Sequence, residues 1–281
     1  MTHIAHILVG TDLTERSELA IQRALQLQEQ MGATLVLLHV IKPQLMGDLA
    51  ERRRRDAQAF LDERITRLPQ SARSRCSRKV AIGDAFTVID CEAQLQRAGL
   101  IVLGEPGRYR YADLFIGTTA DRVVRTSPIP VLVVKGATEG PYRRLLVPLD
   151  LSEGAMHALA TSLAIAPNAE VRIVHAWRPP LAALAQRHAL PEAIRKENEE
   201  IRASIERVAK GAVADSATQG RVLNVDMIEN NPYSVLRSES GWPDLLAMGT
   251  HARSRLATDA IGRLARHMLA EASCDVLVAR P

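Results

Sequence analysis

The chain has 281 residues, of which 47% are hydrophobic, 24% charged and 3% aromatic, which is material for about two globular domains. This composition excludes a wholly disordered chain, and a net charge of +4 with only 2 Trp, 4 Tyr and 3 Phe argues against nucleic-acid binding. The three cysteines have no metal-type spacing and form no disulfide framework. No signal peptide is visible, and no apolar run approaches the ~20 residues of a membrane helix, so we expect a cytoplasmic protein that does not bind membranes.

Short runs rich in Val, Ile and Leu alternate along the chain with longer segments of helical periodicity. In the first half we expect strands at 5–11, 34–41, 77–82, 100–104 and 130–135, with helices at 14–31, 47–68, 85–97 and 114–126. In the second half the expected strands are 143–148, 170–177, 221–228, 244–248 and 275–279, with helices at 152–165, 190–213, 232–240 and 256–272. Strands that are apolar throughout are buried on both faces, so the alternation predicts an α/β fold with parallel sheets.

The two halves repeat one pattern. HILVGTD (6–12) is echoed by RLLVPLD (144–150), LVLLHVI (35–41) by VRIVHAW (171–177), and IPVLVV (129–134) by CDVLVA (274–279). A period this long indicates duplicated domains rather than a solenoid. We therefore predict domains at 1–136 and 142–281, with KGATEGPY (135–142) as the linker because it contains two glycines and a proline.

An open parallel sheet binds ligands at the carboxyl ends of its strands, and several segments of the first half end there. Glycines in the loop after the fourth strand would let backbone amides approach a phosphate, and a glycine followed by threonines leads into a helix N-terminus that favours an anion. On spacing alone this pattern is compatible with a phosphate cradle or with ordinary turn geometry. The candidate residues are Asp12, Val40, Gly104, Gly107, Gly117, Thr118 and Thr119.

The segments IVLG, GTTADRVVR and PVLVV, together with HILVGTD and LLHVI, resemble the signatures of the universal stress protein family, and both halves carry the resemblance. It implies two five-stranded doubly wound domains of order 3-2-1-4-5, similar to adenine nucleotide α-hydrolases, joined through their last strands as an intramolecular pseudo-dimer. It also implies an ATP site, with Mg²⁺ as a candidate companion, in the first domain. There Asp12 would lie at the adenine and ribose end, the Val40 backbone would contact adenine, and the other candidate residues would hold ribose and phosphates.

Some residues depart from that family pattern. Glu105 and Pro106 stand between the first two glycines, where a carboxylate repels phosphate and proline lacks an amide donor. In the second half Ala252 replaces a glycine, and Arg263 replaces the small hydroxyl residue that follows the last glycine. We therefore expect intact binding in the first domain and a degenerate site in the second.

Other features favour plain structural roles. His39 and His175 recur at equivalent positions, but neither has a carboxylate or cysteine at ligand spacing, so no metal site is expected. The run Arg52–Arg55 fits a solvated helix face. Ser152 follows a strand without a nucleophile-elbow sequence, which suits a helix N-cap.

The leading hypothesis is a cytoplasmic stress-response regulator that binds an adenine nucleotide and acts through an unidentified protein partner, without fast catalysis. The apolar last strands would pair within the chain, and a homodimer of whole chains is compatible with the pattern although no residue specifies it. One alternative is a nucleotide-independent scaffold with relic sites. Another is an enzyme that hydrolyses ATP slowly or transfers an adenylyl group, against which stands the lack of a catalytic carboxylate pair.

Overall fold

The computed structural model describes residues 4–43, 48–105, 118–136, 140–178, 192–214, 223–250 and 263–281. In the described residues of the first half, the strands are separated by helices, as the sequence pattern predicts. Its strands are β1 (His6–Thr11), β2 (Thr34–Ile41), β3 (Cys76–Ile82), β4 (Leu100–Gly104) and β5 (Val131–Val134). Its helices are α1 (Glu15–Met31), α2 (Asp48–Thr66), α3 (Gln70–Arg73), α4 (Ala85–Leu95) and α5 (Thr119–Thr126). Among the described elements of the first half, the sequence pattern missed α3, which is too short to show helical periodicity.

The second half repeats this succession. Its strands are β6 (Arg144–Pro148), β7 (Glu170–Trp177), β8 (Leu223–Glu229), β9 (Leu245–Gly249) and β10 (Asp275–Ala279). Its helices are α6 (Glu153–Ile165), α8 (Glu192–Ala214), α9 (Pro232–Glu239) and α10 (Arg263–Glu271). The connection predicted at 178–191 lies outside the described residues, apart from Arg178. Among the described residues, no helix combines the length and apolarity needed to span a membrane.

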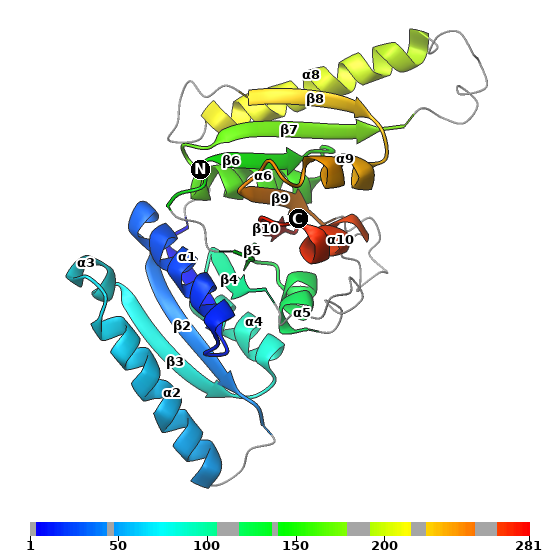
Figure 1. Ribbon diagram of the computed structural model, residues 1–281. Helices are drawn as coiled ribbons and strands as arrows, with labels where there is room; N and C mark the ends of the chain where they lie inside the picture. Colours follow the sequence, from blue (N-terminus) through cyan, green and yellow to red (C-terminus); the bar gives the residue numbers. More distant parts are fainter. Residues whose placement is uncertain are drawn as a thin grey trace.

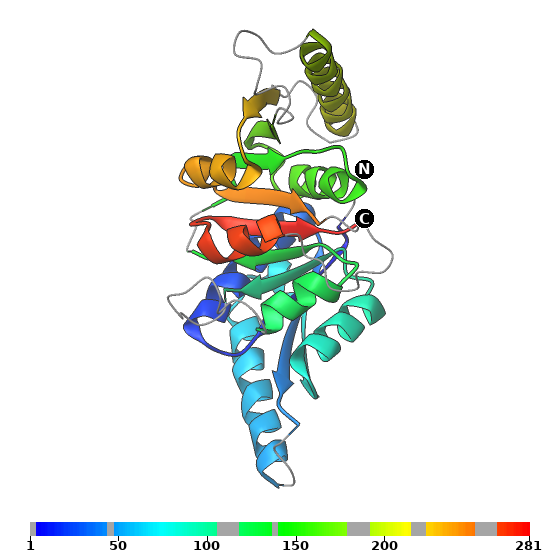
Figure 2. The same cartoon turned by 90° about the vertical axis from the view of Figure 1, so that its right-hand side faces the viewer.

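The ten strands of the described residues form one sheet, in the order β3-β2-β1-β4-β5-β10-β9-β6-β7-β8. Each half has the order 3-2-1-4-5 with parallel neighbours, and the halves join where β5 and β10 pair antiparallel, with Leu132 opposite Leu277. The two strands that would be exposed edges of separate sheets therefore cover each other. The molecule is elongated, and the α2–β3 and α8–β8 layers lie at its two ends (Figures 1 and 2).

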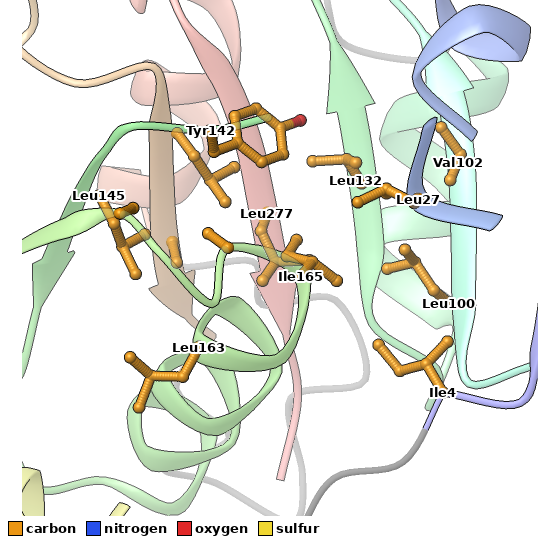
Figure 3. Close-up of a cluster of buried hydrophobic side chains, with 14 of the residues drawn as sticks. Ile4, Leu27, Leu100, Val102, Leu132, Tyr142, Leu145, Leu163, Ile165 and Leu277 are labelled. Carbon is orange, nitrogen blue, oxygen red and sulfur yellow. The ribbon is translucent and has the colours of Figure 1, made fainter. Parts of the chain in front are cut away.

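Helices cover both faces of the sheet because alternate strand residues point to opposite sides. In β1, Ile7 and Val9 join a core cluster with α1, α2, α6 and α8, whereas Leu8 joins a second cluster with α4, α5, α9 and α10. Both clusters run through both halves. In the first, Leu27, Leu132 and Leu277 pack close to the joint (Figure 3), so the apolar core is continuous across it.

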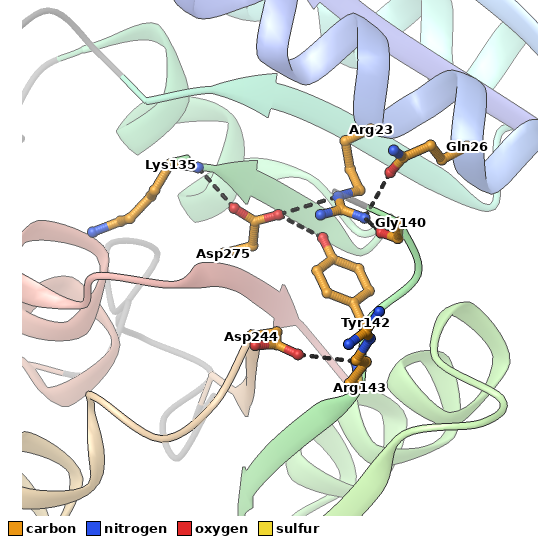
Figure 4. A network of polar contacts seen from close by, with 8 residues as sticks. All are labelled: Arg23, Gln26, Lys135, Gly140, Tyr142, Arg143, Asp244 and Asp275. Atoms are coloured by element: carbon orange, nitrogen blue, oxygen red, sulfur yellow. Dashed lines mark hydrogen bonds and ion pairs between the residues drawn. The ribbon is translucent and has the colours of Figure 1, made fainter. Parts of the chain in front are cut away.

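A buried polar network crosses the same joint (Figure 4). Asp275, at the start of β10, accepts hydrogen bonds from the Lys135 amide (2.9 Å) and the Tyr142 hydroxyl (2.7 Å), and Arg23 Nε lies 3.4 Å from its carboxylate. Arg23 also donates to the Gly140 carbonyl (2.9 Å) and stacks over the Tyr142 ring. Burial raises the pKa of both Asp275 and Tyr142. The network thus fixes α1, the end of β5 and the start of the second half to one carboxylate.

The sequence interpretation assigned Lys135 and Tyr142 to a linker, but both side chains are buried in the joint. Their partner, Asp275, lies far away in the sequence, so no local pattern marks them. Gly136, Gly140 and Pro141 lie in the connection between the two halves, as expected. The residues on either side of them, Lys135 and Tyr142, hold the two halves together.

Candidate functional site

A cavity of about 630 Å³ opens at the carboxyl ends of β1, β2 and β4. This is the edge at which doubly wound sheets bind their ligands. Five of the seven candidate residues line it, whereas Gly107 and Gly117 lie outside the described residues. The five are Asp12, Val40, Gly104, Thr118 and Thr119.

Three helices begin at this cavity. Their first residues, Glu15 of α1, Ala85 of α4 and Thr119 of α5, all line it. The Thr118 side chain caps α5 by accepting from the Asp121 amide (3.1 Å). Since unpaired amides and the helix dipole favour negative charge at an N-terminus, the cavity suits a ligand that carries an anionic group. The sequence reasoning found the α5 terminus but missed that of α4.

Asp12 shapes the entry into α1. One carboxylate oxygen accepts from both the amide (3.1 Å) and the hydroxyl (2.6 Å) of Thr14. Partial burial acts to raise the pKa of Asp12, but these hydrogen bonds and one from Ser17 outweigh it and hold the pKa below its ordinary value. Asp150 makes the same two contacts with Ser152 in the second half, so this bonding does not depend on the larger cavity.

The intervening residues, Leu13 and Leu151, both adopt left-handed backbone conformations, with φ of 64° and 62°. Such a conformation costs a leucine about 1–2 kcal/mol, so its recurrence indicates that the fold requires this turn. Ser152 then caps α6 by accepting from the Ala155 amide (3.3 Å), which confirms the N-cap role predicted for it.

Gly104 is a glycine because a helix passes close to it. A Cβ there would lie 2.9 Å from the Arg16 carbonyl oxygen and 3.3 Å from the Ser17 Cα. At the equivalent Gly249, a Cβ would lie 2.2 Å from the Ala155 amide nitrogen. Packing of the strand end against the first turn of α1 or α6 therefore accounts for both glycines, without reference to a phosphate.

The equivalent cavity of the second half measures only about 140 Å³. Its walls are mainly apolar, and Pro148, Leu149 and Met248 stand where the first half has Gly10, Thr11 and Leu103. The departures on which the expectation of a degenerate site rested, Ala252 and the side chain of Arg263, lie outside the described residues. The described walls nevertheless show a smaller and less polar site, which the glycine spacing alone did not reveal.

Two other predicted features have clear surroundings. His39 Nδ1 lies 2.9 Å from the Thr11 carbonyl oxygen, and His175 Nδ1 lies 2.7 Å from that of Leu149. Each histidine thus links the second strand of its half to the end of the first, which is a structural role. The run Arg52–Arg55 is exposed on α2, in agreement with the predicted solvated face.

Comparison with known proteins identifies the fold. The sequence model of the Universal stress protein family matches residues 3–135 and again 141–280. A universal stress protein from Archaeoglobus fulgidus DSM 4304 superposes with a TM-score of 0.70 at 18% identity, covering 98% of this chain and 96% of that one. A second similar structure, a putative universal stress protein from Pseudomonas aeruginosa UCBPP-PA14, has a TM-score of 0.67 at 22% identity, covering 100% and 94%. With both halves matched, the chain belongs to the universal stress protein family as a tandem member.

Proposed function

We propose that this protein binds one adenine nucleotide per chain, in the first half, and that the second half serves as its built-in partner. The observation that carries the proposal is the contrast between cavities of about 630 and 140 Å³ at equivalent positions. Ligand pockets typically measure about 300–1,000 Å³. Only the first cavity falls within that range, so only the first has room for a base, a ribose and a phosphate.

The roles of the site residues follow from the family resemblance and the cavity walls. The domains would span 1–136 and 142–281, with the base against Val40 at the end of β2 and the phosphate at the N-terminus of α5. Thr118 and Thr119 would hold that phosphate together with Gly107 and Gly117. Gly104 would contribute through its backbone.

The proposed activity is regulatory rather than catalytic. Nucleotide occupancy would change the surface around the start of α5, and a protein partner in the cytoplasm would bind that surface during a stress response. Neither the partner nor a homodimer of the chain is specified by the described residues. A slow ATPase remains the alternative, and steady-state phosphate release at high protein concentration distinguishes the two.

Titration calorimetry with AMP, ADP and ATP tests the proposal, with and without Mg²⁺. We expect one site per chain, and we expect Val40→Trp to abolish binding because an indole would occupy the base position. Ala176→Trp places the same side chain at the equivalent position of the second half, so it is the matched control and should leave binding unchanged.

Absence of heat and of thermal stabilisation with every nucleotide at millimolar concentration would refute the proposal. Two sites per chain would refute the assignment of an inactive second half. Loss of binding in Ala176→Trp but not in Val40→Trp would show that the ligand binds in the second half, which would also refute the proposal.

A further inference from the structure

The strand register of the joint is compatible with pairing between two like halves. Leu132 lies opposite Leu277, with valine opposite valine on either side. The sequences VLVV (131–134) and VLVA (276–279) occupy equivalent positions in the two halves, so this register is symmetric about the leucine pair. Two β5 strands, or two β10 strands, would meet in the same register with the same kind of side chains. Strand pairing therefore does not account for the choice of the second half as partner of the first.

The charged side chains beside the strands are not symmetric. Asp275 directly precedes VLVA, whereas Pro130 directly precedes VLVV. Arg23 of α1 corresponds to Thr161 of α6, since each follows the N-cap of its helix by the same number of residues. The Arg23 and Asp275 side chains are 3% and 1% exposed, and Thr161 is also buried. A buried ion pair between the halves therefore corresponds to a threonine and a proline across the pseudo-two-fold axis.

The further contacts of Arg23 show the same asymmetry (Figure 4). Its guanidinium stacks over the Tyr142 ring and donates to the Gly140 carbonyl, while Gln26 of its own helix supplies one more acceptor. The residue that corresponds to Tyr142 in the first half is the aliphatic Ile4. Both the counter-charge and the ring that Arg23 contacts thus belong to the second half.

A second cation at the joint does not distinguish the halves. Lys135 donates to the Ala272 carbonyl (2.8 Å) beyond the end of α10, and the corresponding Arg280 donates to the Arg125 carbonyl in the last turn of α5. Helix C-termini favour such cations. Because each half supplies one cation to a helix end of the other, a pair of like halves would retain contacts of this kind.

Pairs of like halves would leave charges buried without their partner. Two first halves would bury two Arg23 guanidiniums, with Pro130 in place of Asp275. Two second halves would bury two Asp275 carboxylates, with Thr161 in place of Arg23. Burying a charge without its counter-charge is costly. We propose that the Arg23–Asp275 pair selects the second half as the partner of the first, and rejects a second copy of either half. This selection is independent of the proposed nucleotide binding.

A nicked form of the full chain tests this inference. A specific protease site is inserted after Thr138, in the connection between the halves, and is cut after the chain has folded. Nicked samples with and without ¹⁵N label are mixed, and urea is raised until labelled and unlabelled halves exchange. After removal of the urea, native mass spectrometry identifies which halves form each pair.

We expect fewer than about one in ten wild-type pairs to join like halves. In Arg23→Met with Asp275→Leu both charges are absent, so like pairs should rise to about half, the random proportion when no partner is preferred. Arg23→Met alone should have the same effect, because Asp275 then lacks its counter-charge whichever half it joins. Glu139→Gln removes one acid from the connection and is the matched control, which should keep the wild-type proportion.

Two results would overturn the inference: random pairing in the wild type, or wild-type selectivity in the double variant. The intact chain provides a second measurement. If the pair carries the selection, the effects of Arg23→Met and Asp275→Leu on the unfolding equilibrium constant should be non-additive by at least about tenfold. Additive effects would refute the selection even where nicked halves do not reassemble.

Discussion

Asp275→Ala is expected to be among the most destabilising single substitutions in the chain. The change removes an ion pair with Arg23 and leaves the Tyr142 hydroxyl and the Lys135 amide without their acceptor. Breaking a buried ion pair by removing one partner costs about 3–5 kcal/mol. Because Arg23 retains Gln26, the Gly140 carbonyl and the Tyr142 ring, we expect a loss of about 3–4 kcal/mol in the free energy of unfolding.

Urea unfolding followed by tryptophan fluorescence and far-ultraviolet circular dichroism measures this loss. Both tryptophans, Trp177 and Trp242, lie in the second half, so fluorescence reports on that half and dichroism on the whole chain. A weakened joint should separate the two transitions. Glu63→Ala breaks the exposed pair with Arg67 and should cost at most about 0.5 kcal/mol.

A double variant tests the mechanism behind the loss. Arg23→Met with Asp275→Leu replaces the ion pair by apolar side chains, so it should lose less stability than Asp275→Ala alone. If Asp275→Ala costs under about 1 kcal/mol, or the double variant is the less stable of the two, the joint does not depend on charge compensation and the reasoning is wrong.

Three further outcomes follow from packing and titration. Gly104→Ala should cost about 1–3 kcal/mol because its Cβ meets fixed backbone, whereas Gly211→Ala, in open space on α8, should stabilise by about 0.5–1 kcal/mol; equal unfolding temperatures would contradict this. Burial acts to raise the pKa of Asp244, but hydrogen bonds from a neighbouring guanidinium and two amides hold it below 3.8. The stability that Asp244 contributes is therefore present above about pH 4 and lost as the pH falls through its folded pKa. The difference in free energy of unfolding between the wild type and Asp244→Asn should accordingly decrease in acid, and a difference that stays constant with pH would contradict this. In thiol titration at pH 8, the exposed Cys91 should react quickly, whereas Cys274, whose pKa burial raises to about 11, should react only on unfolding; simultaneous reaction would refute this.

The sequence predicts the fold well because its signals are local. Apolar runs such as those of β4 and β5 can be buried only as central strands, and the repeat of the first strand at 144–150 marks the duplication. The joint could not be predicted in this way, because Lys135 and Tyr142 bind Asp275, which lies beside them only after β10 has paired with β5.

The candidate site was predicted in part. Gly104 and the two threonines line the cavity, while Gly107 and Gly117 lie outside the described residues. Asp12 and Gly104 have counterparts with the same local geometry in the second half. These two residues therefore indicate the fold more than the ligand. The smaller cavity is lined by Pro148 and Met248 where the first half has Gly10 and Leu103. These residues lie on different strands and meet only in the folded sheet.

The antiparallel pairing of β5 with β10 has a thermodynamic consequence. Two separate domains joined by the same strands would dissociate on dilution, whereas halves tethered by a short linker meet at an effective concentration of about millimolar whatever the amount of protein. Expression level therefore cannot control this pairing. Under the proposed function, the second half needs to supply only a strand and a core, so its smaller cavity with Pro148 in the wall would carry no cost.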